Sequence, residues 1–328
     1  MSRPGPHAGS VTTHEVEAPS VPEHLRRWSE LDPDTVEPGS VGFVWGNCQA
    51  ESIRRMVAPA GAGHGVEFVR LPPVFEMDEA EVGRLHALMG VAGVLVTQPV
   101  KDEYRVPGCG SEQLVALLPA GARVVRVPTT YYEGLFPWQV HAHDEAGARV
   151  DAPLTDYHDL RLLDAAVRGW STEQAVARIE SHEATGDGVR DLAARSQAEL
   201  RRRNADLDVD TTDAVVAGGA EAMWTVNHPA NATLHAVGAG VLDTLDWAGE
   251  PAVPEHQMLG SSLSPLDTAV LTALDLDPTA ARPGWSLAGR DVPWAEIADA
   301  QLALYAAQPG VAERAVARYA DRLTSLGL

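Results

Sequence analysis

The stretch Val41-Gly-Phe-Val-Trp-Gly46-Asn47-Cys48-Gln49 decides the fold that we expect. It joins a short apolar, β-rich run to a glycine and then to a helix-compatible segment. Three further β-rich runs follow, at 66–71, 91–97 and 122–127, and helix-compatible segments come at 49–57, 78–89 and 111–118. Strands and helices that alternate in this way predict right-handed crossovers and a parallel sheet covered on both faces. We therefore expect a three-layer α/β sandwich with a short parallel sheet.

Beyond Val127 the pattern changes. Residues 128–153 form a long, aromatic, turn-rich connection of the kind that is often functional. Helical patterns then dominate, at 156–167, 171–182, 191–204, 231–247, 294–307 and 311–326, with one short strand at 223–226. We expect a mobile arm at 1–40 with a short amphipathic helix at 24–31, an α/β catalytic domain at 41–250, and a helical extension at 251–328 packed on it.

The charge balance limits the partners. The 328 residues include 46 acidic and 25 basic side chains, a formal charge of -21. Because this field repels polyanions, we expect no nucleic-acid partner and no anionic membrane surface, although a few local arginines suffice for a small phosphorylated ligand. No stretch of 18 apolar residues and no apolar leader occurs, so we expect no membrane insertion and a cytoplasmic protein.

Cys48 has two interpretations. At the carboxyl end of a parallel strand its side chain points into the crevice where α/β sheets bind ligands, and the free N–H groups of the following helix favour a thiolate and hold an oxyanion. A cysteine placed there suits acyl transfer. The alternative is a small core residue, the usual place of a free cysteine. The only other cysteine is Cys109, so a disulfide scaffold or a thiolate zinc site is not expected.

A second polar cluster, Asn227-His228-Pro229 with Asn231, precedes a long predicted helix. An imidazole beside an asparagine, in a turn stiffened by proline, suits a general base with an orienting partner. The alternative is an ordinary helix start, where Asn and Pro are common for capping reasons.

Together the two features reproduce the layout of SGNH-type hydrolases, with sulfur in place of the serine oxygen, and a flavodoxin-like or SGNH-like strand order. Beyond the layout, the chain resembles the WcbI-like family of capsular polysaccharide biosynthesis acetyltransferases. Four segments carry this resemblance over residues 41–247: Gly46-Asn47-Cys48-Gln49 with Ser52, Gln98-Pro-Val-Lys-Asp102-Glu-Tyr104-Arg105, Pro128 with Tyr131-Tyr132, and Asn227-His228-Pro229 with Asn231.

The resemblance implies an enzyme that binds coenzyme A and transfers acetyl from this small-molecule donor to a carbohydrate-like hydroxyl acceptor. The catalytic candidates are Cys48, His228, Asn47, Gln49 and Asn227, and the cofactor-binding candidates are Gly46, Ser52, Gln98, Arg105, Tyr131 and Tyr132. No metal is implied.

Two chemical routes are open at this point. Either a low-pKa Cys48 accepts acetyl from acetyl-CoA, or His228 deprotonates the acceptor directly while Asn47, Gln49 and the helix start stabilise the oxyanion. Two other functions also stay open: a cysteine esterase or thioesterase, and a non-catalytic protein that binds coenzyme A or a glycan. The aspartate expected three residues before the histidine of SGNH hydrolases is replaced by Thr225, which favours transfer over hydrolysis.

Overall fold

The computed structural model describes residues 22–328. The N-terminal half is built on a four-stranded parallel sheet of order β2-β1-β3-β4. Its strands are β1 (Val41–Trp45), β2 (Glu67–Val69), β3 (Ala92–Thr97) and β4 (Arg123–Arg126). The outer part of the predicted arm, residues 1–21, lies outside the described residues.

The strand order creates a switch point beside β1. From β1 the chain crosses to β2 on one side, and then returns past β1 to β3 and β4 on the other. These are the first four strands of the flavodoxin-like order, in which ligands bind at the carboxyl ends of the strands where the order reverses. The predicted fold class is therefore confirmed, and the strand order reverses between β1 and β3.

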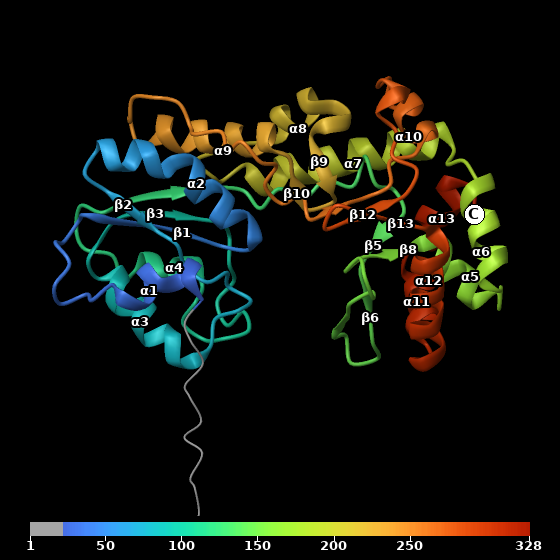
Figure 1. The fold of residues 1–328 in the computed structure, drawn as a ribbon, viewed down its shortest axis with the longest axis horizontal. Helices are drawn as coiled ribbons and strands as arrows, with labels where there is room; N and C mark the ends of the chain where they lie inside the picture. The colour runs from blue at the N-terminus through green and yellow to red at the C-terminus, as the bar shows by residue number, and fades with distance from the viewer. Residues whose placement is uncertain (1–21) are drawn as a thin grey trace, which may run out of the picture.

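Helices cover both faces of the sheet, which gives three layers (Figure 1). Helices α2 (Cys48–Gly63) and α9 (Asn231–Thr244) pack on the face that Val44 contributes to, whereas Phe43 and Trp45 point into the core on the opposite face. Burial on both faces explains why β1 is apolar throughout. The opposite face is covered by α1 (Arg26–Glu30), α3 (Glu79–Met89) and α4 (Ser111–Val115).

The segment before the sheet is folded from residue 22 onward. The helix predicted at 24–31 is present as the 3-10 turn η1 (Glu23–Leu25) followed by α1. Trp28 and Leu31 are buried in the core below the sheet, and Arg84 of α3 donates from Nε to the carbonyl oxygen of Trp28 at 3.0 Å. This part of the predicted arm thus belongs to the fold, because its two apolar side chains complete the core.

The C-terminal half is mainly helical, as the sequence predicts. Ser171 caps α6, and the single helix predicted at 311–326 is two helices, because the chain turns at Tyr319. The helices are α5 (Leu160–Val167), α6 (Thr172–Ser181), α7 (Gly186–Asn204), α8 (Thr212–Gly218), α10 (Thr268–Ala273), α11 (Trp294–Ala307), α12 (Val311–Arg318) and α13 (Ala320–Leu326), with 3-10 turns η2 (Gly219–Glu221) and η3 (Pro278–Ala280).

Small antiparallel sheets join these helices. The strand predicted at 223–226 is β9 (Met223–Thr225), which pairs with β10 (His228–Pro229). The other short strands are not predicted by the sequence, because two or three residues carry no measurable period. They are β5 (Gln139–Val140), β6 (Ala142–His143), β7 (Arg149–Val150), β8 (His158–Asp159), β11 (Ser262–Leu263), β12 (Trp285–Leu287) and β13 (Arg290–Val292).

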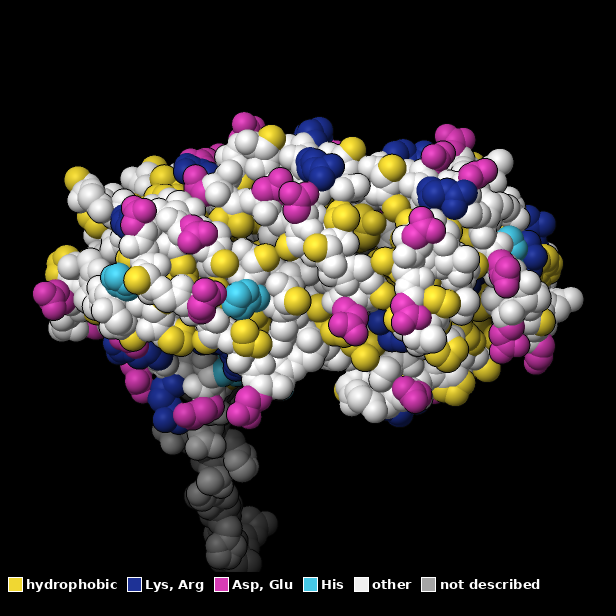
Figure 2. Space-filling model, turned by 90° about the horizontal axis from the view of Figure 1, so that it is seen from above, with side chains coloured by type: hydrophobic (Ala, Val, Ile, Leu, Met, Phe, Trp, Pro, Cys, Tyr) yellow, Lys and Arg dark blue, Asp and Glu magenta, His cyan; other side chains and the backbone are white. Residues whose placement is uncertain are grey.

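The C-terminal helices pack around a hydrophobic core of their own, apart from the cores on the two faces of the parallel sheet. Helices α11 and α12 pack on α5, and α10 and α13 pack on α7, around buried side chains such as Leu160, Ile297 and Leu326. Seen from above, acidic side chains are scattered among arginines over the whole face, without one gathering of either sign (Figure 2). Among the helices of residues 22–328, none combines the length and the apolar character that crossing a bilayer requires.

Candidate active site

Cys48 is the first residue of α2 and lies at the carboxyl end of β1. Asn47 caps the helix, because its side-chain oxygen accepts a hydrogen bond from the backbone N–H of Gln49 at 2.9 Å. Gly46 leaves room for Gln98, whose side chain a Cβ at position 46 would overlap. The strand, the glycine and the cap therefore fix the thiol at the predicted crevice.

Gln98 ties the two central strands together at this edge. It follows β3, and its Oε1 accepts from the backbone N–H of Asn47 at 2.8 Å. Its Nε2 donates to Oε1 of Gln49 at 3.2 Å and to the carbonyl oxygen of Pro128 at 3.1 Å. The buried Gln98 amide has no donor left, so it positions the start of α2 rather than offering a contact to a ligand.

Gln49 connects the carboxyl ends of β1 and β3 to the polar cluster of Asn227 and His228. Its Nε2 donates to the carbonyl oxygens of Thr130, at 2.9 Å, and Asn227, at 2.8 Å, while its Oε1 also accepts from the N–H of Thr130 at 3.1 Å. All four hydrogen-bonding positions of this amide are thus used inside the protein. The sequence suggested Gln49 as an oxyanion donor, whereas the structure uses it to join the segments that carry Cys48 and His228.

Asn227 is held by a tyrosine that the sequence analysis missed. The Tyr157 hydroxyl donates to Oδ1 of Asn227, and Oγ1 of Thr225 donates to the same oxygen at 3.2 Å. Burial raises the pKa of Tyr157 to about 12, and the nearby Cys48 sulfur acts in the same direction, so the phenol stays a donor. Tyr157 lies in an irregular segment before β8, because α5 begins at Leu160 and not at residue 156 as the sequence predicts.

His228 lies on β10, next to Asn227. Burial lowers the pKa of its imidazole, and the Asp156 carboxylate counteracts this only in part. Nδ1 is buried and has no hydrogen-bond partner among the described residues, whereas Nε2 is the more accessible ring nitrogen. A neutral imidazole with an accessible nitrogen suits a general base, and the missing partner at Nδ1 agrees with the absence of a triad aspartate.

The thiol differs from the activated cysteine that the sequence suggested. Burial raises the pKa of Cys48 to about 11, although the N–H groups of Cys48 and Gln49 act in the opposite direction. Desolvation disfavours the charged sulfur more strongly than two backbone dipoles favour it. Cys48 is therefore a protonated thiol at neutral pH in this structure.

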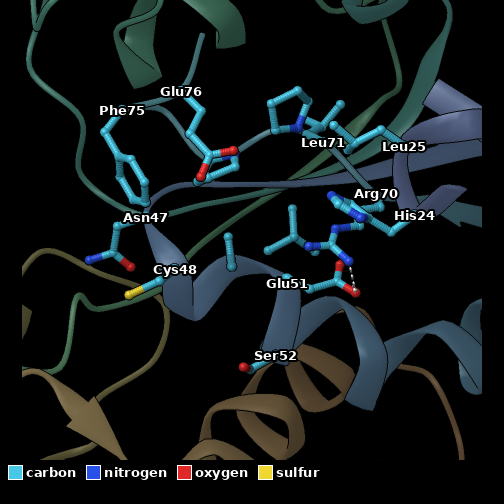
Figure 3. A pocket seen from close by; sticks show the side chains of 14 residues that line it. His24, Leu25, Asn47, Cys48, Glu51, Ser52, Arg70, Leu71, Phe75 and Glu76 are labelled. Atoms are coloured by element: carbon cyan, nitrogen blue, oxygen red, sulfur yellow. Dashed lines mark ion pairs between the residues drawn. The ribbon is translucent and has the colours of Figure 1, made fainter. Parts of the chain in front are cut away.

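A cavity of about 420 Å³ opens beside Cys48 (Figure 3). It lies between the start of α2 and the loop after β2, and a hydrogen bond of 2.9 Å from Val74 N–H to the Gly46 carbonyl fixes that loop. Apolar and polar side chains share the wall. They include Asn47, Cys48, Ser52, Arg70, Leu71, Pro72, Pro73 and Phe75.

The remaining predicted contacts are distributed differently. Ser52 lines the cavity, while Arg105 is exposed and donates to the carbonyl oxygen of Phe75 at 3.3 Å, on the cavity's loop. Tyr131 lies under the Arg203 guanidinium, 5.7 Å from ring centre to Cζ. Tyr132 is buried and lines a separate cavity of about 300 Å³ with α7 and α8. The structure thus brings Ser52 and the Arg105 segment to Cys48, and leaves the side chains of both tyrosines outside that cavity.

Comparison with known proteins gives two matches. A family model described as "Polysaccharide biosynthesis enzyme WcbI" matches residues 41–250. A solved structure of WcbI, called a novel polysaccharide biosynthesis enzyme, aligns with a TM-score of 0.73 at 18% identity, over 89% of this chain and 98% of the other. That structure is described as the native protein without a disulfide bond between coenzyme A and one of its cysteines. No curated protein matches significantly.

Proposed function

The chain belongs to the WcbI family of polysaccharide biosynthesis enzymes, and from this premise we propose that it is an acyl-CoA-dependent O-acetyltransferase. The acceptor is a hydroxyl group of a sugar or a related molecule. The same proposal places the enzyme in the cytoplasm, where acetyl-CoA is available, with two small-molecule substrates as its partners.

The residues around Cys48 suit the donor. The solved WcbI structure is described in terms of coenzyme A and a cysteine, and this chain has a cysteine at the start of α2 beside a cavity. The wall formed by Leu71, Pro72 and Phe75 is apolar, as the pantetheine arm requires, and Ser52 adds a hydroxyl group. Acetyl-CoA supplies an activated acyl group with a thiol as leaving group.

The hydrogen bond between Gln49 and Asn227 is the observation that carries the proposal, because it joins the thiol segment to the imidazole segment. In the proposed reaction His228 Nε2 accepts the proton of the acceptor hydroxyl as the oxygen bonds to the acyl carbon. The imidazolium then returns this proton to the departing sulfur, so the base is regenerated. The N–H of Cys48, in the first turn of α2, donates to the acyl oxygen as it gains negative charge.

This route leaves Cys48 unmodified. A thiol with a pKa of about 11 is a poor nucleophile at neutral pH, and a neutral imidazole needs no thiolate partner. We therefore assign Cys48 a binding and positioning role beside the acyl group, and the chemistry to His228. The side-chain oxygen of Asn47 is used by the helix cap, while its Nδ2 donates to no acceptor in the described part of the chain.

The test is a transfer assay with acetyl-CoA and a panel of mono- and oligosaccharides. We expect release of free coenzyme A to depend on the acceptor, an acetylated product by mass spectrometry, and loss of both in His228→Ala. Release at the same rate without any acceptor would instead identify a thioesterase. Tight binding of acetyl-CoA without turnover on any acceptor would favour the non-catalytic alternative.

A further inference from the structure

The cavity beside Cys48 has a second, cationic end. Cys48 and Asn47 lie at one side of the labelled residues, and Arg70 and His24 lie at the other (Figure 3). Arg70 directly follows β2, which pairs with β1 on the side opposite β3. It therefore reaches the cavity from the β2 end of the sheet. The cavity therefore presents a thiol at one end and a guanidinium group at the other.

The hydrogen-bonding capacity of Arg70 is unused. Its Nε is buried and has no hydrogen-bond partner among the described residues, although 28% of the side chain is exposed. Within residues 22–328, this guanidinium makes one ion pair, to Oε1 of Glu51 at 3.8 Å, which is too long for a hydrogen bond. A guanidinium group has five N–H donors, and a buried donor without an acceptor costs free energy. A ligand oxygen at this position would remove that cost.

Glu51 does not neutralise this end of the cavity. Arg54 binds the carboxylate through two hydrogen bonds, at 2.7 and 3.0 Å, and Arg55 binds it through one, at 3.0 Å. Together with Arg70, three guanidinium groups share one carboxylate, which leaves two positive charges. These arginines lower the pKa of Glu51 despite its burial, so the carboxylate is ionised. The charge left over is notable in a chain with a formal charge of -21.

One further carboxylate lines the cavity, so three guanidinium groups face two carboxylates and one positive charge is left over. Glu76 lines the cavity beside Phe75, on the side away from Glu51 (Figure 3). His24 lies beside Arg70, and His256 is 3.2 Å from Arg55 Nη1, so neither imidazole supplies a negative charge. Of the three arginines, Arg70 lines the cavity, while Arg54 and Arg55 bind the carboxylate of Glu51 that it shares with them.

We propose that Arg70 binds a phosphate group of the ligand whose reactive end lies beside Cys48. A phosphate offers several acceptor oxygens and up to two negative charges, which match the unused donors and the excess charge. The orientation of the ligand rests on the proposed function, in which the donor has a thiol at one end and phosphates at the other. A nucleotide-activated sugar acceptor would supply the same phosphate chemistry.

Titration calorimetry of the full chain at low salt tests this site with three probes: coenzyme A, pantetheine and uridine diphosphate. Pantetheine keeps the thiol arm and lacks phosphate. We expect Arg70→Gln to weaken coenzyme A about tenfold or more, with pantetheine unchanged within about twofold and Arg70→Lys in between. Arg202→Gln, which removes an exposed arginine paired with Glu199 on α7, is the charge-matched control.

The probes separate the possible phosphate sources. Weaker uridine diphosphate with unchanged coenzyme A in Arg70→Gln assigns the site to a phosphorylated acceptor and supports the phosphate site. Three results would overturn the phosphate site. They are wild-type affinity of Arg70→Gln for both coenzyme A and uridine diphosphate, a loss of pantetheine affinity equal to that of coenzyme A, and no binding of coenzyme A or uridine diphosphate to the wild type. If the wild type bound uridine diphosphate but not coenzyme A, the proposed donor would be refuted. Loss of uridine diphosphate binding in Arg70→Gln would in that case still support the phosphate site.

Discussion

The side chain of Gln49 donates from Nε2 to the backbone carbonyl oxygen of Asn227 at 2.8 Å, across 178 positions of sequence. This contact lies inside the protein, next to Cys48 on one side and His228 on the other. It ties the segment that carries Cys48 to the segment that carries His228, since neither the start of α2 nor β10 can shift without breaking it. The geometry of the proposed reaction therefore depends on an amide that does not itself take part in the chemistry.

Replacement of Gln49 tests this role. Gln49→Ala leaves the carbonyl oxygens of Thr130 and Asn227 without a donor, and we expect the free energy of unfolding to fall by about 2 to 4 kcal/mol. Gln49→Glu keeps the shape of the side chain but places an oxygen against both carbonyl oxygens. We expect its free energy of unfolding to fall at least as far as that of Gln49→Ala. Urea denaturation measures the first effect. A drop in kcat larger than the rise in KM, in the fraction that remains folded, distinguishes positioning from mere stability; Gln308→Ala, at an exposed site, is the control.

The architecture around this contact was largely predictable. The two central strands, β1 and β3, are apolar runs because both of their faces are buried, and such runs stand out from the polar turns that separate them. The position of Cys48 at the carboxyl end of the central strand β1 follows directly from the order of strand and helix in the sequence. The short strands between 139 and 159 and between 262 and 292 carry no such pattern, because two or three residues are too few to show a period.

The chemistry of the site was less predictable, for physical reasons. A helix start after a strand is visible in the sequence, but the burial that raises the Cys48 pKa is a property of the packed molecule. The amides of Gln49 and Gln98 were expected to face ligands, and their partners became evident only with the fold. Arg70 directly follows β2 and Tyr157 directly precedes β8, and the predicted strand and helix that contain them did not connect either residue to Cys48.

His228 should be the group that limits the rate at low pH. Burial lowers the pKa of its imidazole below the usual 6.5, and only the neutral ring accepts a proton. We therefore expect kcat/KM to be constant at neutral pH and to fall as the pH drops through a midpoint below 6.5. A midpoint above that value would contradict the assignment.

Variants at His228 and at a second histidine give the size of the contribution of His228 to kcat/KM. We expect His228→Ala to reduce kcat/KM by about a hundredfold to ten-thousandfold while the thermal transition is retained. His143→Ala, which alters a histidine on β6 outside the site, should keep the wild-type rate and pH profile.

Tyr157 should act on the rate through Asn227. Tyr157→Phe removes the hydroxyl that donates to Asn227 Oδ1 but keeps the ring that stacks on Trp285. We expect kcat to fall several-fold to about tenfold with KM nearly unchanged, since one hydrogen bond to a positioning residue is lost. Tyr319→Phe, which removes a hydroxyl bonded to the carbonyl of His141, serves as the comparison. Equal losses in both variants would indicate a general packing effect instead.

Cys48 should react slowly with alkylating agents. Because only the thiolate attacks iodoacetamide and the pKa of Cys48 is about 11, we expect labelling at pH 8 to be slower than that of a free cysteine derivative. The rate should rise about tenfold per pH unit until the pH approaches this pKa. Peptide mapping separates Cys48 from the buried Cys109, whose pKa burial also raises. In the same preparation Cys48→Ser should keep turnover within about tenfold of wild type, because His228 activates the acceptor directly. Fast labelling near neutral pH, together with an acetylated Cys48 after exposure to acetyl-CoA, would replace this route with an acyl-enzyme.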